Sequence, residues 1–466
     1  MPRKSTVSLD ALIPLGAPRL AQLVLDETET NPAFKKRISA ALASTQGPDA
    51  VARVIDRRLA ALERARSQVA YEKERAFAED LGATVDTILK ELAPLNSFSA
   101  IERLLRFVGT NETVFGRIDD SGGRIQAVYW RAAEAIPGLV EKLPPEDRAL
   151  MPDRLQHSIS QDGHGLGRAI AIEVIPLLPA ASLAAWDQAL CDASGGNEEF
   201  LKIRQAIADA RGDLETYLAL EQRLPVWQQD PLAVAERLLA VRRLDEALQW
   251  VRRERKGGLV VMNYSDIADG RVTRPHDLKR VRLEARILEA MQNRPAAQDL
   301  RWKSFETTLD ANILREHIGK LDDFEEFDEL DKAFATAAAS SQVYTALAFF
   351  IAWPRIDLAA KLVLEKSAIW DGRHYDMLGD AAEVLEEDFP LAATLLYRVL
   401  LNDILTRAKS PAYGAGARHL VRLGALAARV SAYGKMEDHV AYVQKLRIAH
   451  GRKTGFWSVV AGKNRS

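Results

Sequence analysis

The sequence predicts an all-α protein, with a helical-hairpin N-terminal region followed by an irregular tetratricopeptide-like α-solenoid. Apolar residues recur at spacings of three and four along most of the chain, as they do on the buried face of an amphipathic helix. The alternation of apolar and polar residues that marks a half-buried strand is almost absent. Stretches of the second half also share one pattern of small and large apolar residues, which indicates repeated helix pairs.

Length and composition set the class of protein. A chain of 466 residues exceeds one compact core, so we expect two to four domains or one extended array. Hydrophobic residues make up 47% and charged residues 27%, as in ordinary soluble proteins. The net charge of -2 argues against a protein defined by a global nucleic-acid or membrane field. The single cysteine, Cys191, excludes an internal disulfide and any multi-cysteine metal site.

The N-terminal region, residues 1–95, contains the longest periodic stretch. A helical lead-in over residues 9–42 is interrupted near Pro14. Residues 48–90 then keep apolar positions in helical register with charges between them. This pattern predicts a long charged helix that pairs with a neighbour as a helical hairpin, with a break expected at Gly82. A second region, residues 96–225, predicts shorter helices separated by glycine-rich loops.

The third region, residues 226–466, carries the repeat pattern and ends in a predicted capping helix. Two stretches share the spacing of a tetratricopeptide unit: Val234, Ala235, Leu238, Leu244, Ala247 and Val251, and Ala346, Leu347, Phe350, Ile356, Ala359 and Val363. A third helix pair is expected over residues 381–399, where Ala393 lies 34 positions after Ala359, the length of one such repeat. Between residues 252 and 305 the pattern is irregular, which predicts insertions, and residues 259–262 could form a short strand.

Residues 333–354 carry no charge and raise the question of a membrane span, which needs about 20 mostly apolar residues. Ser340, Ser341 and Gln342 lie near the middle of this stretch and predict two buried helices that meet at a polar turn. The N-terminus lacks the apolar core of a signal peptide. We therefore expect no membrane association and a cytoplasmic location.

Three segments resemble a known family. The chain opens with SLDALIPLGAPRLAQL at residues 8–23, contains DGHG at 162–165, and closes with YVQKLRIAHGRKTGFW at 442–457. Together these segments resemble a family of bacterial proteins known as the domain of unknown function numbered 6880. The resemblance implies a helical, tetratricopeptide-like fold and brings no activity or functional residues. The closing segment also resembles the tail of proteins with a SWIM zinc finger, but the cysteine pair of that finger is missing here.

No catalytic, cofactor or metal-binding motif is found. The loop from Gly163 to Arg168 lacks the spacing and the Gly-Lys-Ser/Thr of a phosphate loop, so a structural turn is favoured. The eight histidines show no zinc-ligand spacing on one helix. His374 with Asp376 and His276 with Asp277 could imitate an acid–base pair, but a surface or capping role is favoured.

Charge is segregated along the second half. Residues 237–303 contain sixteen Lys/Arg against nine Asp/Glu, whereas residues 306–332 contain ten acids against three bases. Residues 435–466 are again basic, with seven bases against two acids. Solvated helix faces explain such runs, and a partner surface is the alternative. The candidate contact surface comprises Arg252, Arg253, Arg255, Lys256, Arg280, Arg282, Arg286, Arg452 and Lys453.

These observations favour a non-enzymatic interaction or scaffold protein whose helical-repeat surface holds another protein or a peptide, with no cofactor. The first alternative is a nucleic-acid-associated protein that binds through the basic stretches. Phe456 and Trp457 beside Arg452 and Lys453 mix aromatic and basic residues as single-strand binders do, although the same residues suit a docked terminal cap. The second alternative is an unrecognised enzyme, which requires converging polar groups with shifted pKa values in a pocket.

Overall fold

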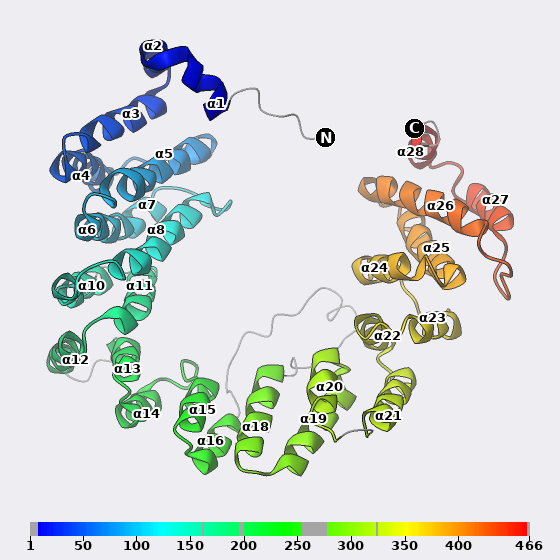
Figure 1. Ribbon diagram of the computed structural model, residues 1–466. Coiled ribbons are helices and arrows are strands. Elements are labelled where there is room, and N and C mark those ends of the chain that lie inside the picture. Colours follow the sequence, from blue (N-terminus) through cyan, green and yellow to red (C-terminus); the bar gives the residue numbers. More distant parts are fainter. Residues whose placement is uncertain (1–7, 161–162, 195–199, 254–276, 323–324, 464–466) are drawn as a thin grey trace. The chain divides into compact units, whose positions relative to one another are not determined.

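The computed structural model describes residues 8–160, 163–194, 200–253, 277–322 and 325–463. The chain divides into two compact units, Met1–Gln229 and Asp230–Ser466 (Figure 1). Every regular element of the described residues is a helix, so the all-α prediction is confirmed. The short strand considered at residues 259–262 lies outside the described residues.

The first unit consists of short and medium helices that pack on near neighbours in the sequence. In chain order they are α1 (Leu9–Leu12), η1 (Ile13–Leu15), α2 (Gly16–Thr30), α3 (Pro32–Ser44), α4 (Pro48–Arg64), η2 (Tyr71–Lys73), α5 (Glu74–Thr87), the π-helical turn η3 (Ile88–Leu92), α6 (Ser97–Val108), α7 (Asn111–Phe115), α8 (Arg124–Val140), α9 (Pro145–Arg148), α10 (Met151–Ser160), α11 (Leu166–Val174), η4 (Ile175–Leu177), α12 (Ala180–Ser194), α13 (Leu201–Ala210) and α14 (Leu214–Arg223).

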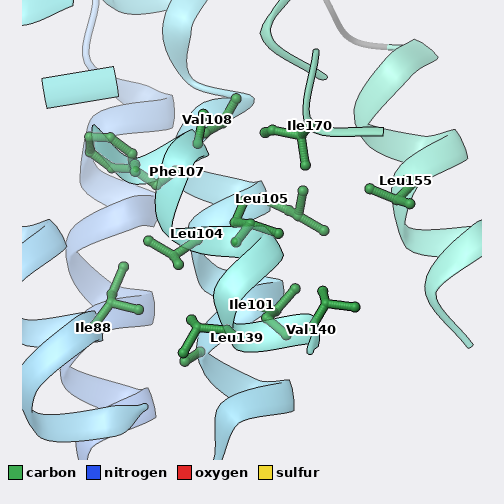
Figure 2. Packing of buried hydrophobic residues seen from close by; sticks show 14 of the residues in the cluster. Ile88, Ile101, Leu104, Leu105, Phe107, Val108, Leu139, Val140, Leu155 and Ile170 are labelled. Carbon is green, nitrogen blue, oxygen red and sulfur yellow. The ribbon is translucent and has the colours of Figure 1, made fainter. Parts of the chain in front are cut away.

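One continuous hydrophobic cluster, with members from Ala43 to Ile207, joins most helices of this unit, and Leu201, Leu220 and Leu224 form a separate small cluster. Helix α6 lies at its centre, where Ile101, Leu104 and Phe107 are fully buried. Figure 2 shows these side chains meeting residues of the neighbouring helices, among them Ile88 and Ile170. Residues on both sides of position 95, the expected limit of the N-terminal region, therefore share one core.

The long helix expected over residues 48–90 is two helices. Helix α4 ends at Arg64 and the backbone of Ala65 is extended, with φ -66° and ψ 133°. In the segment that follows α4, the Val69 amide donates to the Arg117 carbonyl at 2.9 Å. A tertiary hydrogen bond thus takes the place of a helical one. Helix α5 then packs on α4. Gly82, where a break was expected, lies inside α5 and accepts a bond from the Arg131 guanidinium on its carbonyl at 2.9 Å.

The second unit is also a series of helices, each packing chiefly on the next one or two in the sequence. They are α15 (Pro231–Ala240), α16 (Leu244–Val251), α18 (Leu278–Ala290), α19 (Arg294–Thr308), α20 (Ala311–Ile318), α21 (Glu325–Ala339), α22 (Val343–Ala352), α23 (Ile356–Glu365), α24 (Tyr375–Leu385), α25 (Pro390–Thr406), η6 (Ser410–Ala412), α26 (Tyr413–Ala427), α27 (His439–His450) and α28 (Thr454–Lys463).

The three predicted helix pairs are present as α15–α16, α22–α23 and α24–α25. Their small residues lie where the helices touch: Ala235, Ala247, Ala359 and Ala393 are fully buried. Alanine at these positions lets two backbones approach closely, and larger neighbours such as Phe350 fill the remaining space. The uncharged stretch at 333–354 also forms two helices, α21 and α22, around the predicted polar turn. Among the described residues, no helix is long and apolar enough to cross a membrane.

One type of turn recurs between paired helices. The amides of Asp213, Arg243, Asn293, Arg355 and Lys409 each donate to the carbonyl five residues earlier, at 2.8–3.1 Å. This bond is the 6→1 bond of a Schellman motif, in which the preceding residue is left-handed. That residue is Gly212 with φ 68° in one turn, but it is Arg242 with φ 61° and Gln292 with φ 61° in others. Asn293 also caps the following helix through its side chain, so one residue ends one helix and starts the next.

The C-terminal helix docks as the predicted cap. Phe456 of α28 is fully buried and its ring lies 5.8 Å from that of Tyr413 on α26. A side chain at Gly416 would approach the Phe456 ring to 3.3 Å, so glycine permits this close packing. Trp457 donates to the His450 carbonyl at 3.0 Å and its ring is covered by Arg447 at 5.1 Å. Both aromatic residues therefore serve packing.

The turn geometry yields a stability prediction. Gln292→Gly is expected to raise the free energy of unfolding by about 0.5–1 kcal/mol, because the left-handed conformation costs a side-chain residue roughly 1–2 kcal/mol while glycine adds entropy to the unfolded chain. Urea unfolding followed by circular dichroism measures the change. Gln292→Ala keeps the left-handed cost and is the control. Equal stability of the two variants would contradict the strain argument.

A basic groove with an apolar floor in the first unit

A groove of about 760 Å³ lies between α3, α4 and α5, the blue helices of the first unit in Figure 1. Helix α4 begins at Pro48 after Gly47 and turns its apolar stripe toward the core, so Ile55 and Leu62 are buried. Val54 and Phe77 are half-buried, so part of the apolar lining stays open to the groove. The apolar residues that line it include Ala40, Val54, Ile55, Leu62 and Phe77.

The rim of the groove is strongly basic. Three elements contribute: α3, α4 and the turn after α7. The cationic residues are Lys35, Lys36, Arg37, Arg57, Arg58 and Arg117. Within the described part of the chain, Asp80 of α5 is the one acidic residue that lines the groove. Six positive side chains against one carboxylate give the groove a net positive charge, although the whole chain carries a net charge of -2.

Asp80 ties the three helices together. Its carboxylate lies 2.8 Å from Lys36 Nζ of α3 and 2.5 Å from Arg58 Nη2 of α4. The Arg58 guanidinium also donates to the Asp80 carbonyl at 2.7 Å. Partial burial raises the pKa of Asp80, but the hydrogen bond from Lys36 and the charge and hydrogen bond of Arg58 outweigh it, so the pKa lies below its usual value. Asp80 is therefore ionised at neutral pH.

The remaining cations of the rim are not neutralised by carboxylates. Within the part of the chain that the structure describes, Lys35, Arg37, Arg57 and Arg117 form no ion pair. Arg57 donates to the Arg53 carbonyl at 3.3 Å and is otherwise exposed. Arg117 is buried, donates to the Ser67 carbonyl at 3.2 Å and lies over the Phe77 ring at 5.8 Å. Lys35, Arg37 and Arg57 are exposed, so they can meet an anionic partner without breaking an existing ion pair.

In the basic surface predicted from the sequence, two of the cations form ion pairs, unlike the unpaired cations of the groove. Arg252 at the end of α16 lies 2.6 Å from Glu284, and Arg282 of α18 lies 2.6 Å from Glu316. Both cations are thereby neutralised within the unit. Glu316 lies outside residues 237–303 and offsets part of their excess of bases, whereas Glu284 is one of the nine acids within that range.

The other predicted contact residues are spread over the second unit. Arg253 covers the Trp250 ring at 3.5 Å. Arg280 and Arg286 lie on α18, and Arg286 is exposed. Arg452 and Lys453 lie in the turn between α27 and α28. Arg255 and Lys256 lie outside the described residues.

Sequence reasoning missed the groove. One signal was available: the run from Lys35 to Arg37 and the pair Arg57-Arg58 lie on consecutive predicted helices. Arg117 had no such signal, because only the tertiary contact with Phe77 brings it to the groove.

The glycine-rich loop before α11 is a structural turn among its described residues. Gly165 starts α11 with φ 81°. A side chain at Gly167 would lie 2.8 Å from the Ser158 carbonyl, so glycine permits the close contact of α11 with α10. No group of three metal-ligating side chains occurs among the residues that the structure describes.

The cluster that most resembles an acid–base site lies between α24, α25 and α26. Tyr397 donates to Glu386, and Arg422 donates to Glu383 at 2.7 Å and to the Tyr397 hydroxyl. Burial and the Glu386 hydrogen bond raise the pKa of Tyr397, whereas burial and the Arg422 charge lower the pKa of His419 to about 4. Tyr397 is fully buried, so its hydroxyl is engaged inside the protein. These contacts join three helices.

By its architecture the chain is an all-α protein of consecutive helix pairs. It belongs to the family of unknown function numbered 6880 (DUF6880), whose model matches residues 2–199 and 194–459. The resemblance read from the two ends and the middle of the sequence is thereby confirmed.

No curated protein matches the chain. One similar solved structure is described as a circular tandem repeat protein with novel repeat topology and enhanced subunit contact surfaces. It shows 12% identity over 91% of this chain and 92% of its own, with a TM-score of 0.17. A TM-score this low means that the two backbones do not superpose, so the similarity says nothing about the fold or partners of this chain.

Proposed function

We propose that this protein is a non-enzymatic interaction protein of the cytoplasm whose first unit holds an acidic amphipathic helix of a partner protein. The observation that carries the proposal is the groove of about 760 Å³, in which six cations surround an apolar floor and face one carboxylate. A helix laid in a groove is a common way for a folded domain to bind a peptide.

The apolar floor favours a peptide over a phosphate backbone. Burial of apolar surface contributes about 25 cal/mol per Å², and a partner must offer apolar side chains to gain it. Nucleic-acid binding depends instead on phosphate contacts, which need no apolar floor, or on bases stacked on exposed aromatic rings. In the groove Phe77 is half-buried and covered by Arg117. Titration with an oligonucleotide beside the peptide distinguishes nucleic-acid binding through the basic rim from peptide binding.

The charges of the rim would orient the partner helix and accelerate its association with the groove. Acidic side chains on one face of the partner helix would meet Lys35, Arg37 and Arg57, while its apolar face covers Val54 and Phe77. Such complementarity accelerates encounter and rejects basic partners. Because these cations are exposed, salt weakens the attraction, with a screening length of about 8 Å at physiological ionic strength.

Charge reversal at Arg57 tests the proposal. The probe is a fluorescein-labelled amphipathic helix of glutamate and leucine, titrated against the full chain and followed by anisotropy. Arg57→Glu is expected to weaken binding about tenfold, because it replaces an attraction by a repulsion at the rim. Arg64→Glu is the matched control: Arg64 is also exposed on α4, also donates to the carbonyl four residues earlier, and does not line the groove.

Arg64→Glu should keep the affinity within about twofold of the wild type, since Arg64 does not line the groove and its exposed charge is screened by salt. Equal effects of the two variants would contradict the assignment of the groove. A single-stranded oligonucleotide that binds more tightly than the peptide, with the same dependence on Arg57, would favour nucleic acid instead.

A second prediction concerns the removal of the Asp80 carboxylate from the groove. Asp80→Asn leaves Lys36 and Arg58 unpaired and makes the groove more positive, so the acidic peptide should bind a few-fold more tightly. The variant should also lose about 0.5–1 kcal/mol of stability, in keeping with partly exposed ion pairs. The control is Asp86→Asn on the same helix, since Asp86 pairs with Lys90 and Arg131, each at 3.1 Å, and lies outside the groove.

The peptide titration and urea unfolding measure both effects of Asp80→Asn. A gain in affinity cannot come from misfolding. Unchanged affinity in a folded Asp80→Asn protein would show that the carboxylate does not face the bound peptide.

A further inference from the structure

A second pocket of the first unit has the opposite character. It measures about 480 Å³ and lies where α7, the start of α8 and the start of α11 meet. Four rings and two carboxylates line it: Phe115, Tyr129, Trp130, His164, Asp119 and Asp120. Among the residues that the structure describes, no lysine or arginine lines it. We propose that this pocket binds a quaternary ammonium group.

Three of the four rings are in contact with one another. Phe115 lies in the middle, with its centroid 5.4 Å from that of Tyr129 and 5.1 Å from that of His164, the latter in an edge-to-face arrangement. Tyr129 is buried and its hydroxyl bonds to Thr110 at 2.7 Å, which fixes its ring. Trp130 is 42% exposed, and His164 is also exposed. Accessible ring faces attract a cation, and tryptophan does so most strongly.

The two carboxylates are held in place by the backbone. Asp120 accepts from the amides of Ile125 at 3.0 Å and Gln126 at 2.8 Å, so it caps α8. Asp119 accepts from the Ser121 amide at 3.0 Å through one oxygen and is exposed. These bonds keep negative charge in the lining of the pocket and disfavour an anionic ligand. The arrangement thus combines fixed negative charge with aromatic surface.

The chemistry of the wall selects the kind of cation. A metal ion prefers several oxygen or nitrogen ligands, and no group of three such side chains occurs among the described residues. A primary ammonium has N–H donors that water satisfies well. A trimethylammonium group has no N–H donor and is suited to ring faces, which is how aromatic cages bind choline and methylated lysine. The same chemistry comes from two sources: a small molecule such as choline, or a trimethyllysine side chain.

The test is a ligand-observed NMR titration of the full chain with choline and with a trimethyllysine peptide. The control ligand is 3,3-dimethylbutanol, which has the shape of choline without the charge. We expect choline or the trimethyllysine peptide to bind at least about tenfold more tightly than the neutral ligand, because the ring faces and carboxylates recognise charge. Tighter choline binding assigns a small molecule, and tighter peptide binding assigns a modified protein.

Two variants test whether the ligand binds in this pocket. Trp130→Ala and Asp119→Asn change exposed side chains and should each weaken binding about tenfold, with circular dichroism unchanged. Trp227→Ala is the control, because Trp227 is 72% exposed and lies outside the pocket. The proposal is overturned if neither cation binds, if the neutral ligand binds equally well, or if Trp227→Ala weakens binding as much as Trp130→Ala.

Discussion

Close contact between neighbouring helices through small residues is the constraint on which this structure depends. An amphipathic helix of ten residues cannot bury its apolar face alone, so each pair must cover the next. In the second unit Ala235, Ala247, Ala359 and Ala393 are fully buried at such contacts. The recurrent Schellman turns fix the geometry, since one residue ends a helix while the next starts its partner. The first unit uses the same principle around α6, where a single cluster runs from Ala43 to Ile207.

This mode of packing leaves surfaces free for function. Because the core lies between adjacent helices, outward residues of each helix can vary without disturbing it. The groove lies between α3, α4 and α5, and basic residues surround its apolar floor. Asp80 holds the three helices together and at the same time reduces the positive charge of the groove. The aromatic pocket is lined by carboxylates instead, so the described residues of one unit form a basic groove and an acidic pocket.

The sequence predicted the parts of the fold that local patterns determine. Helix pairs such as α22–α23 follow from the spacing of Ala346, Phe350 and Ala359, and the buried cap follows from Leu446 and Phe456. The break after Arg64 was not predicted, because the bond from Val69 to Arg117 joins residues far apart in the sequence. For the same reason charge counting could not show which cations are paired: Glu284 and Glu316 neutralise Arg252 and Arg282 across helices. The groove needed tertiary structure, since three helices and a distant arginine form it.

We propose the groove of the first unit as the partner site. Hydrogen exchange of the full chain, measured with and without the acidic amphipathic peptide, shows which helices the peptide covers. We expect slower amide exchange in α3, α4 and α5 when the peptide is bound, because a bound helix excludes water and damps local opening there. Slower exchange confined to α18 or to the turn at Arg452 and Lys453, with α3 to α5 unchanged, would contradict the assignment. It would show that the peptide binds the second unit instead.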